Sequence, residues 1–193
     1  MILLRHGESE FNVVYSATGQ DPGIRDPRLT ERGHEQAREA AIKLAEHGVK
    51  RTLASPFTRP LETAAALGLP TTIEATVRER GAFACDVGTP ASALMADWPH
   101  HDFSHLDELW WHADEESEAE VLVRADRFRD LARTWPDHHE LVVVSHWGFI
   151  LALTGRSVKN CEMVIFDPTS PCAGLIPLDA CSRAPSMLGP AES

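Results

Sequence analysis

Apolar residues fall into two alternating patterns along the chain. Short, mainly apolar runs are typical of strands buried on both faces of a sheet, and they predict strands at 1–4, 51–55, 71–75, 140–145 and 161–167. Stretches in which apolar residues recur every three or four positions indicate amphipathic helices, and these lie at 30–48, 58–69, 117–135 and 147–155. The alternation predicts an α/β fold with three layers, α/β/α, and a mostly parallel central sheet.

Capping residues mark the ends of two predicted helices. Thr30 is a suitable N-cap and Gly48 a suitable C-cap for the first of them. Ser117 and Glu120 have the spacing of a capping box at the start of another helix. These residues therefore support the helix boundaries that the apolar pattern indicates.

Two stretches have neither pattern. Residues 16–28 are rich in Gly, Asp and Pro and are predicted to form a polar loop. Residues 80–113 are predicted to be irregular, apart from a short helix that starts near Pro90. We expect one domain over 1–180 and a flexible C-terminal tail over 181–193, where Pro, Ser and Gly recur every few positions.

Length and charge narrow the possible functions. A chain of 193 residues with 43% hydrophobic and 24% charged residues can bury one substantial core. Its net charge of −11 argues against nucleic acid or an anionic membrane as a partner. A few arginines gathered in one cleft can nevertheless bind a small anion, because they decide the local potential.

The sequence also predicts where the protein resides. No apolar run reaches the ~18 residues of a membrane span, and no leader pattern precedes the first strand. The four cysteines show no CxxC spacing. We therefore expect a cytoplasmic protein with reduced thiols. The sequence is compatible with a homodimer but does not decide the oligomeric state.

Polar and charged residues follow the predicted strands at the points where ligands bind in open α/β sheets. Arg5 and His6 end the first strand, and His146 directly follows a buried one. Arg59 falls in the first turn of a helix that follows a strand, and Glu79 lies shortly after the third strand. Because the carboxyl ends of parallel strands meet at one edge of a sheet, we expect these side chains to converge. Alternatively, Arg5 and His6 only solvate the end of their strand.

This convergence fits a phosphate group. The guanidinium of arginine is planar and permanently charged, and it matches phosphate oxygens in bidentate fashion. Helix N-termini offer free N–H groups with partial positive charge. Two predicted helices begin beside Arg59 and His146, so we expect their first amides to take part. The sequence thus predicts a site for a small phosphorylated substrate.

Three segments, LLRHGESEFN, SPFTRPLETA and VVVSHWG, resemble the signature segments of the histidine phosphatase superfamily. LTERGHEQA resembles the first-helix segment of the same superfamily. The resemblance runs from Met1 to about Asp167, and the middle of the chain looks most like a phosphomutase-like branch. It implies a phosphoglycerate mutase-like fold.

The resemblance also implies a role for each matching residue. His6 would be the nucleophile that forms a phosphohistidine, and Glu79 would be the proton donor. The residues that would complete the phosphate pocket are Arg5, Asn12, Arg59 and His146. The chain departs from many members at Trp147, which follows the second histidine where they have glycine.

The chemistry of these side chains is consistent with that implication. A neutral imidazole nitrogen is a competent nucleophile at pH 7 when an acceptor holds its other nitrogen. Arginines and a donor histidine stabilise the loose transition state of phosphoryl transfer. A carboxylic acid such as Glu79 protonates the leaving alkoxide and then activates water. We therefore expect a metal-independent phosphomonoesterase, a histidine acid-type phosphatase, that needs no cofactor.

Several conspicuous residues lie outside this predicted site. His100, His101 and His105 lack a recognised metal-ligand spacing, so no metal site is predicted. Other large side chains in the irregular stretch either fill the core or face the substrate, and the sequence leaves both possibilities open for Phe83, Trp110, Trp111 and His112.

Alternatives remain for the function and for Glu79. A mutase would move phosphate within a sugar acid, and a non-catalytic protein would only bind a phosphorylated ligand. Mutases of the superfamily usually carry extra segments that shield the site, and the short chain favours a phosphatase. Glu79 could instead form a structural ion pair with its neighbours Arg78 or Arg80.

Overall fold

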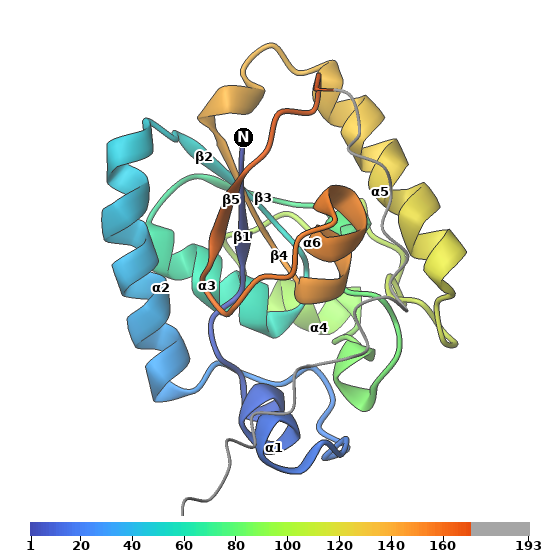
Figure 1. Cartoon of the computed structure of the whole chain (residues 1–193). Helices are drawn as coiled ribbons and strands as arrows, with labels where there is room; N and C mark the ends of the chain where they lie inside the picture. The colour runs from blue at the N-terminus through green and yellow to red at the C-terminus, as the bar shows by residue number, and fades with distance from the viewer. Residues whose placement is uncertain (171–193) are drawn as a thin grey trace, which may run out of the picture.

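The computed structural model describes residues 1–170, in which a five-stranded sheet lies between helices (Figure 1). The strands are β1 (Ile2–Arg5), β2 (Arg51–Ala54), β3 (Thr71–Ile73), β4 (Leu141–Ser145) and β5 (Met163–Ile165). Their order in the sheet is β3-β2-β4-β1-β5. The first four strands are parallel to one another, and β5 is antiparallel to β1. The predicted, mostly parallel sheet is therefore confirmed.

Helices cover both faces of the sheet. They are α1 (Glu10–Thr18), α2 (Glu31–Leu44), α3 (Thr58–Leu67), α4 (Ala91–Asp97), α5 (Glu118–Arg133) and α6 (Trp147–Thr154). Figure 1 shows α2 and α3 on one side of the sheet, α5 and α6 on the other, and α1 beyond the end of the strands. The three predicted layers are thus present. The predicted N-caps are present too, since Thr30 accepts from the amide of Gly33 and Ser117 forms a capping box with Glu120. Gly48 caps a 3₁₀ turn, Ala45–His47, that continues α2, rather than α2 itself.

Two hydrophobic cores explain why the strands are apolar without alternation. Successive side chains of a strand point to opposite faces. Leu3 of β1 and Val143 of β4 pack into the core on the side of α5 and α6. Leu4 and Val144 pack into the other core, on the side of α2 and α3. Because both faces are covered, every position of these strands is buried until the strand ends.

Helix α1 is not predicted by the sequence, and its last three residues lie in the segment expected to be a loop. Phe11 is its only buried residue, so the apolar pattern of the helix is weak. A capping box starts it instead: Asn12 donates its amide to the Ser9 hydroxyl, and the Ser9 amide donates to Asn12 Oδ1 at 3.1 Å. The polar spacing of Ser9 and Asn12, rather than apolar periodicity, carries the signal.

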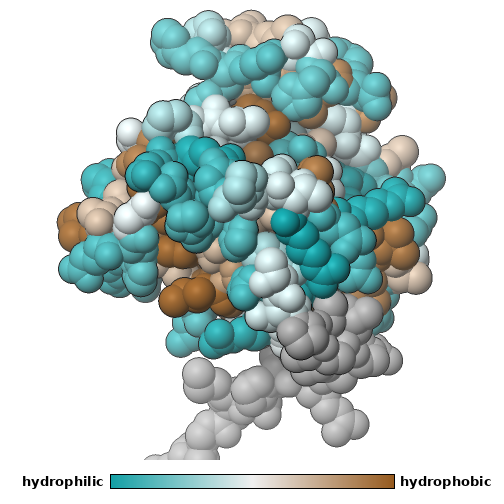
Figure 2. Space-filling model, turned by 90° about the horizontal axis from the view of Figure 1, so that it is seen from above, coloured by the Kyte–Doolittle hydropathy of each residue, from teal (hydrophilic) through white to brown (hydrophobic). Residues whose placement is uncertain are grey.

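The visible surface is largely hydrophilic. Figure 2, seen from above, shows hydrophilic residues over most of one face, with hydrophobic residues in separate patches. Among the helices of residues 1–170, none combines the length and apolar character needed to cross a membrane. The predicted tail at 181–193 lies outside the described residues.

Candidate active site

Three of the predicted side chains meet at the carboxyl ends of the strands. The rings of His6 and His146 have centroids 5.1 Å apart. Arg59, in the first turn of α3, places its Nε 3.3 Å from His6 Nε2. At most 3% of each of these residues is exposed. They lie together because β1, β2 and β4 are adjacent and parallel, so the residues after each strand share one edge.

Hydrogen bonds determine which nitrogen of His6 carries the proton. His6 Nδ1 lies 2.7 Å from the carbonyl oxygen of Gly7. A carbonyl only accepts, so Nδ1 is the donor and Nε2 keeps its electron pair. Burial, followed by the charges of Arg59 and Arg5, lowers the pKa of His6 well below its usual value. His6 is therefore a neutral imidazole whose free electron pair, on Nε2, faces Arg59.

Glycine at position 7 permits the backbone approach that orients His6. A Cβ atom on Gly7 would lie 2.5 Å from the carbonyl oxygen of Gly33. Any larger residue would push the segment after β1 away from α2. Since the carbonyl of Gly7 holds His6 Nδ1, that displacement would also turn the imidazole.

Two buried donors at this site have no partner among residues 1–170. Arg5 donates from Nη1 to the carbonyl oxygen of Val158 at 2.9 Å, but its Nε is unpaired. His146 Nε2 lies 2.9 Å from the Ser55 hydroxyl, and its Nδ1 is unpaired. The Ser55 hydroxyl can donate to Nε2, which leaves the proton on Nδ1. Unpaired buried donors cost free energy, and the oxygens of a phosphoryl group would satisfy both.

The charges of these groups suit an anion. Burial lowers the pKa of Arg5 to about 10, so the guanidinium stays charged at neutral pH. Burial, followed by Arg59 and His6, lowers the pKa of His146, which is therefore a neutral donor. The positive charge of the site thus comes from arginines rather than from histidines.

Asn12 reaches the site through a second asparagine. The side-chain amide of Asn160 donates to Asn12 Oδ1 and to the carbonyl of His6, both at 3.1 Å. Asn12 Oδ1 also serves the capping box of α1. Only the NH₂ group of Asn12 therefore remains to bind a phosphoryl oxygen. The sequence did not single out Asn160.

Glu79 lies at the N-terminus of α6. Its Oε1 accepts from the amides of Arg80 at 2.8 Å and Phe149 at 3.2 Å, and its Oε2 accepts from Gly148 at 3.2 Å. Burial, and next the charge of Asp86, raises the pKa of Glu79 above the usual range. The raised pKa shifts this carboxyl toward the protonated form that a general acid needs.

The arginines beside Glu79 have other partners. Arg78 pairs with Glu116 at 3.1 Å, and Arg80 pairs with Glu115 at 3.3 Å. Within residues 1–170 neither guanidinium forms an ion pair with Glu79. The alternative that Glu79 is one half of such a pair is therefore wrong.

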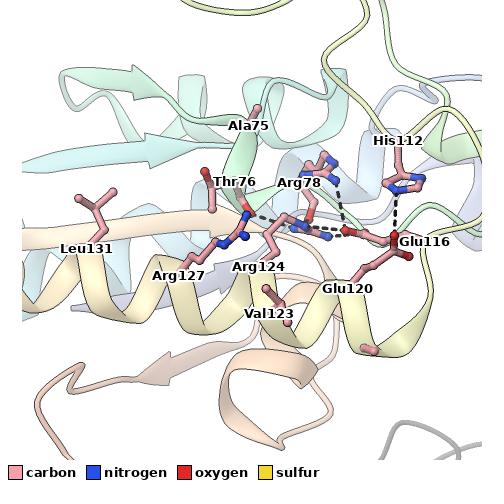
Figure 3. Close-up of a pocket in the computed structure, with 11 residues that line it drawn as sticks. Ala75, Thr76, Arg78, His112, Glu116, Glu120, Val123, Arg124, Arg127 and Leu131 are labelled. Atoms are coloured by element: carbon pink, nitrogen blue, oxygen red, sulfur yellow. Dashed lines mark hydrogen bonds and ion pairs between the residues drawn. The ribbon is translucent and has the colours of Figure 1, made fainter.

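The main chain around Glu79 is held from behind by α5. Arg124 donates to the carbonyls of Thr76 and Arg78 at 2.9 and 2.8 Å and to that of Glu79 at 3.3 Å. Figure 3 shows Arg124 and Arg78 pointing toward Glu116, which pairs with both, in the wall of a pocket of about 640 Å³. This ion-pair cluster lies behind the main chain of 76–79 and positions it.

Three main-chain amides in the first turns of α3 and α6, which the sequence predicts to bind phosphate, have partners within the protein. The amides of Gly148 and Phe149 in α6 bind Glu79. At the start of α3, the Thr58 amide donates to Asp26 at 2.8 Å. Acidic side chains already accept from these three amides, where their charge is favourable, so these three do not hold phosphate. For the amides of Arg59 and Trp147, in the same first turns, the expectation stays a prediction.

Asp86 is a residue of the site that the sequence analysis missed. Its Oδ1 lies 3.1 Å from Arg59 Nη2, and each residue of the pair is almost fully buried. Arg59 Nη1 also donates to the carbonyl of Cys85 at 2.8 Å. Asp86 lies in the irregular stretch, where no pattern of spacing predicts which side chain turns inward.

The large side chains of the irregular stretch divide between core and surface. Trp110 is buried and packs on Phe57, which in turn packs on His146. Phe83 is 41% exposed and contacts Phe11 of α1. Trp110 therefore supports the site from the core.

Trp111 and His112 line pockets, and Trp147 is the first residue of α6. Trp111 lines a second pocket of about 480 Å³, and His112 lines the pocket beside Arg124. Trp147 is half-buried and donates to the Ser157 hydroxyl at 3.0 Å. Among residues 1–170 no three His, Cys, Asp or Glu side chains are grouped so that they could hold a metal ion.

Comparisons with known proteins bear on the family and the fold. The family model described as "Histidine phosphatase superfamily (branch 1)" matches residues 1–167. The glucosyl-3-phosphoglycerate phosphatase of Mycolicibacterium vanbaalenii is 29% identical over 171 residues, 80% of this chain and 72% of that protein. Phosphoserine phosphatase 1 of Hydrogenobacter thermophilus is 31% identical over 154 residues, 76% of this chain and 70% of that protein.

Other matches extend over different lengths. A solved mycobacterial glucosyl-3-phosphoglycerate phosphatase shares the fold with a TM-score of 0.58 at 24% identity, covering 84% of this chain and 88% of that one. Curated 2,3-bisphosphoglycerate-dependent phosphoglycerate mutases match over 54 to 89 residues. The chain spans only 24–41% of the length of these mutases.

Proposed function

Because the chain belongs to the histidine phosphatase superfamily (branch 1), we propose that it is a metal-independent phosphomonoesterase that acts on a small phosphorylated metabolite through a phosphohistidine. The observation that carries this proposal is the state of His6. Its Nδ1 proton is held by the Gly7 carbonyl, and its Nε2 electron pair faces the buried, positively charged part of the site.

The first half-reaction transfers the phosphoryl group to His6. The Nε2 electron pair forms a bond to phosphorus, and the bond from phosphorus to the ester oxygen breaks. The Arg59 Nε–H, held 3.3 Å from Nε2, donates to the phosphoryl oxygen that comes to lie beside Nε2. Arg5 Nε and His146 Nδ1, the two unpaired donors, bind the other oxygens. Glu79 gives its proton to the departing alkoxide.

The second half-reaction returns the enzyme to its starting state. Glu79, now a carboxylate, takes a proton from a water molecule whose oxygen attacks the phosphorus. The bond between phosphorus and Nε2 breaks, and its electron pair returns to His6. Inorganic phosphate leaves, and Glu79 is again protonated. Both protons and both bonds are then accounted for without a metal ion.

The length over which this chain matches its relatives favours a phosphatase over a mutase. The two phosphatases match over at least three quarters of this chain, whereas the mutases match over shorter segments. Glucosyl-3-phosphoglycerate and phosphoserine are both phosphomonoesters of small molecules that carry a carboxylate. We therefore propose a substrate of this class.

Phosphate release in excess EDTA tests the proposal. The purified protein should release phosphate from p-nitrophenyl phosphate, phosphoserine or 3-phosphoglycerate, and His6→Ala should not. Activity that disappears on chelation and returns with Mg²⁺ or Zn²⁺ would contradict it. Interconversion of 3- and 2-phosphoglycerate would favour the mutase instead, and phosphate binding without turnover would favour a non-catalytic protein.

A further inference from the structure

The carboxylate of Asp86 has a donor for each of its lone pairs. Oδ1 accepts from Arg59 Nη2 at 3.1 Å and from the Cys85 thiol at 3.4 Å. Oδ2 accepts from the amides of Ala82 and Phe83 at 3.2 and 3.1 Å. Only 4% of the residue is exposed. Such a set of donors suits a charged carboxylate, which accepts four hydrogen bonds and donates none.

These contacts fix the direction of the Arg59 guanidinium. Its Nη2 binds Asp86 and its Nη1 binds the Cys85 carbonyl. Because the guanidinium is planar and rigid, two fixed nitrogens also fix the third. The third nitrogen, Nε, points at His6 Nε2. The side chain of Asp86 thus sets where Arg59 directs its donor.

Asp86 also acts on the charge of Glu79, because its negative charge is the largest cause after burial that raises the pKa of the Glu79 carboxyl. Asp86 has a direct ion pair, whereas Glu79 receives only main-chain amides. Burial raises the pKa of Asp86 as well, but the charge of Arg59 and the amides of Ala82 and Phe83 act in the opposite direction. The direct ion pair therefore favours the charged form of Asp86 and the protonated form of Glu79. The other charged or titratable groups near Glu79 are Arg59 from α3, Arg5 from β1 and Cys85, while Arg124 from α5 binds its carbonyl.

We propose that Asp86 is a positioning residue of this site, which aims Arg59 at the reacting nitrogen of His6 and keeps the shared proton on Glu79. The aiming of Arg59 concerns binding geometry alone, whereas the role of the Glu79 proton rests on the proposed function. Asp86 touches neither the phosphoryl group nor the leaving group, and it acts through Arg59 and Glu79.

The test compares two substitutions of Asp86 with a matched control. Asp86→Asn removes the charge, and Asp86→Glu keeps it while displacing the carboxylate. Asp21→Asn is the control, because Asp21 also anchors the segment before α4, through the Ala84 amide at 2.8 Å, without touching Arg59. Calorimetry measures the affinity for inorganic phosphate. Kinetics from pH 5 to 9 on p-nitrophenyl phosphate and glycerol phosphate gives kcat, KM and the pH limbs.

The positioning role predicts opposite effects on binding and on turnover. In Asp86→Asn the affinity for phosphate should rise about tenfold, because one negative charge no longer repels the anion. The value of kcat should fall about 10²-fold on both substrates, because Arg59 is misdirected. The alkaline limb for glycerol phosphate should move to lower pH, since Glu79 ionises more readily without its charged neighbour. Asp86→Glu should lower kcat without moving that limb, and Asp21→Asn should change neither.

Several outcomes would overturn the proposal. Weaker phosphate binding in Asp86→Asn with an unmoved pH limb would make Asp86 a structural anchor. Loss of rate on glycerol phosphate alone would make Asp86 itself the proton donor. If Asp86→Asn does not fold, full kcat or a moved limb in Asp86→Glu decides against the proposal. If the wild-type protein hydrolyses nothing, the proposed function fails, but the phosphate affinity of Asp86→Glu, which keeps the charge and displaces Arg59, still tests the aiming of Arg59: it should fall, and an unchanged affinity would decide against the proposal.

Discussion

Gly148 leaves the space that the carboxylate of Glu79 occupies: a Cβ atom on Gly148 would lie 2.5 Å from Glu79 Oε1. The Gly148 amide donates to the other oxygen of the same carboxylate at 3.2 Å. Glu79 therefore contacts the first turn of α6 directly, at Gly148, the residue after Trp147. Glycine at position 148 thus admits the candidate proton donor.

Substitution at Gly148 should therefore act through Glu79. Gly148→Ala should destabilise the protein by about 1–3 kcal/mol, because the added methyl group overpacks a buried contact. In a Glu79→Ala background the same substitution should be neutral or should stabilise the helix by up to about 1 kcal/mol. Chemical denaturation of the four proteins measures this coupling. An equal loss of unfolding free energy in both backgrounds would show that the space left by Gly148 is not needed for Glu79.

Glu79→Gln should discriminate between leaving groups. A general acid matters when the departing alkoxide is basic and matters little for p-nitrophenolate, which leaves unaided. The rate on glycerol phosphate should fall by about 10²–10⁴-fold, and the rate on p-nitrophenyl phosphate far less. The loss of rate at high pH, where Glu79 ionises, should also disappear. Equal losses on both substrates with an unchanged pH profile would make Glu79 structural.

The part of the site that follows strands could be predicted from the sequence. Arg5 is the last residue of β1, and His6 directly follows it. His146 directly follows β4, and Arg59 lies in the first turn of the helix after β2. Their convergence follows from local patterns, because parallel strands share one edge. Their chemical roles come from the resemblance and stay proposals.

The rest depends on contacts that no local pattern encodes. Asp86 lies 27 positions from Arg59 in a stretch without periodicity, and only the folded path of that stretch turns it inward. The sequence indicates where α3 and α6 begin. It does not indicate that Asp26 and Glu79 reach back to occupy their first amides. Long-range contacts of this kind decide whether a helix end is free for a ligand.

Removal of Arg59 should leave Asp86 as an uncompensated buried charge. Arg59→Met should therefore destabilise the protein by about 3–5 kcal/mol. The double variant Arg59→Met/Asp86→Asn should regain a substantial part of that loss, because the orphaned charge is removed as well. Thermal and chemical denaturation of the single and double variants gives the coupling. Additive losses would mean that the two residues do not stabilise each other.

His146 should make stability depend on pH. Its pKa is lowered in the folded state, so below about pH 6.5 the unfolded chain binds a proton that the folded protein excludes. This contribution is present at higher pH and is lost as the pH falls. His146→Asn should therefore reduce the fall of stability between pH 6.5 and 5 by up to about 1.4 kcal/mol per pH unit.

Denaturation curves at several pH values measure that slope. The same substitution at the exposed His47 is the control for the chemical change itself. A slope that is identical in the wild type and in His146→Asn would contradict a neutral, buried His146.

In the proposed reaction His6 accepts the phosphoryl group on Nε2, because its Nδ1 is hydrogen-bonded to the Gly7 carbonyl at 2.7 Å. Rapid quenching of turnover under basic conditions, followed by mass spectrometry and isomer-specific detection of phosphohistidine, tests it most directly. An acid-labile phosphoryl group should appear on Nε2 of His6 in the wild type and be absent from His6→Ala. A phosphoryl group on Nδ1, on another residue, or equally in both proteins would contradict it.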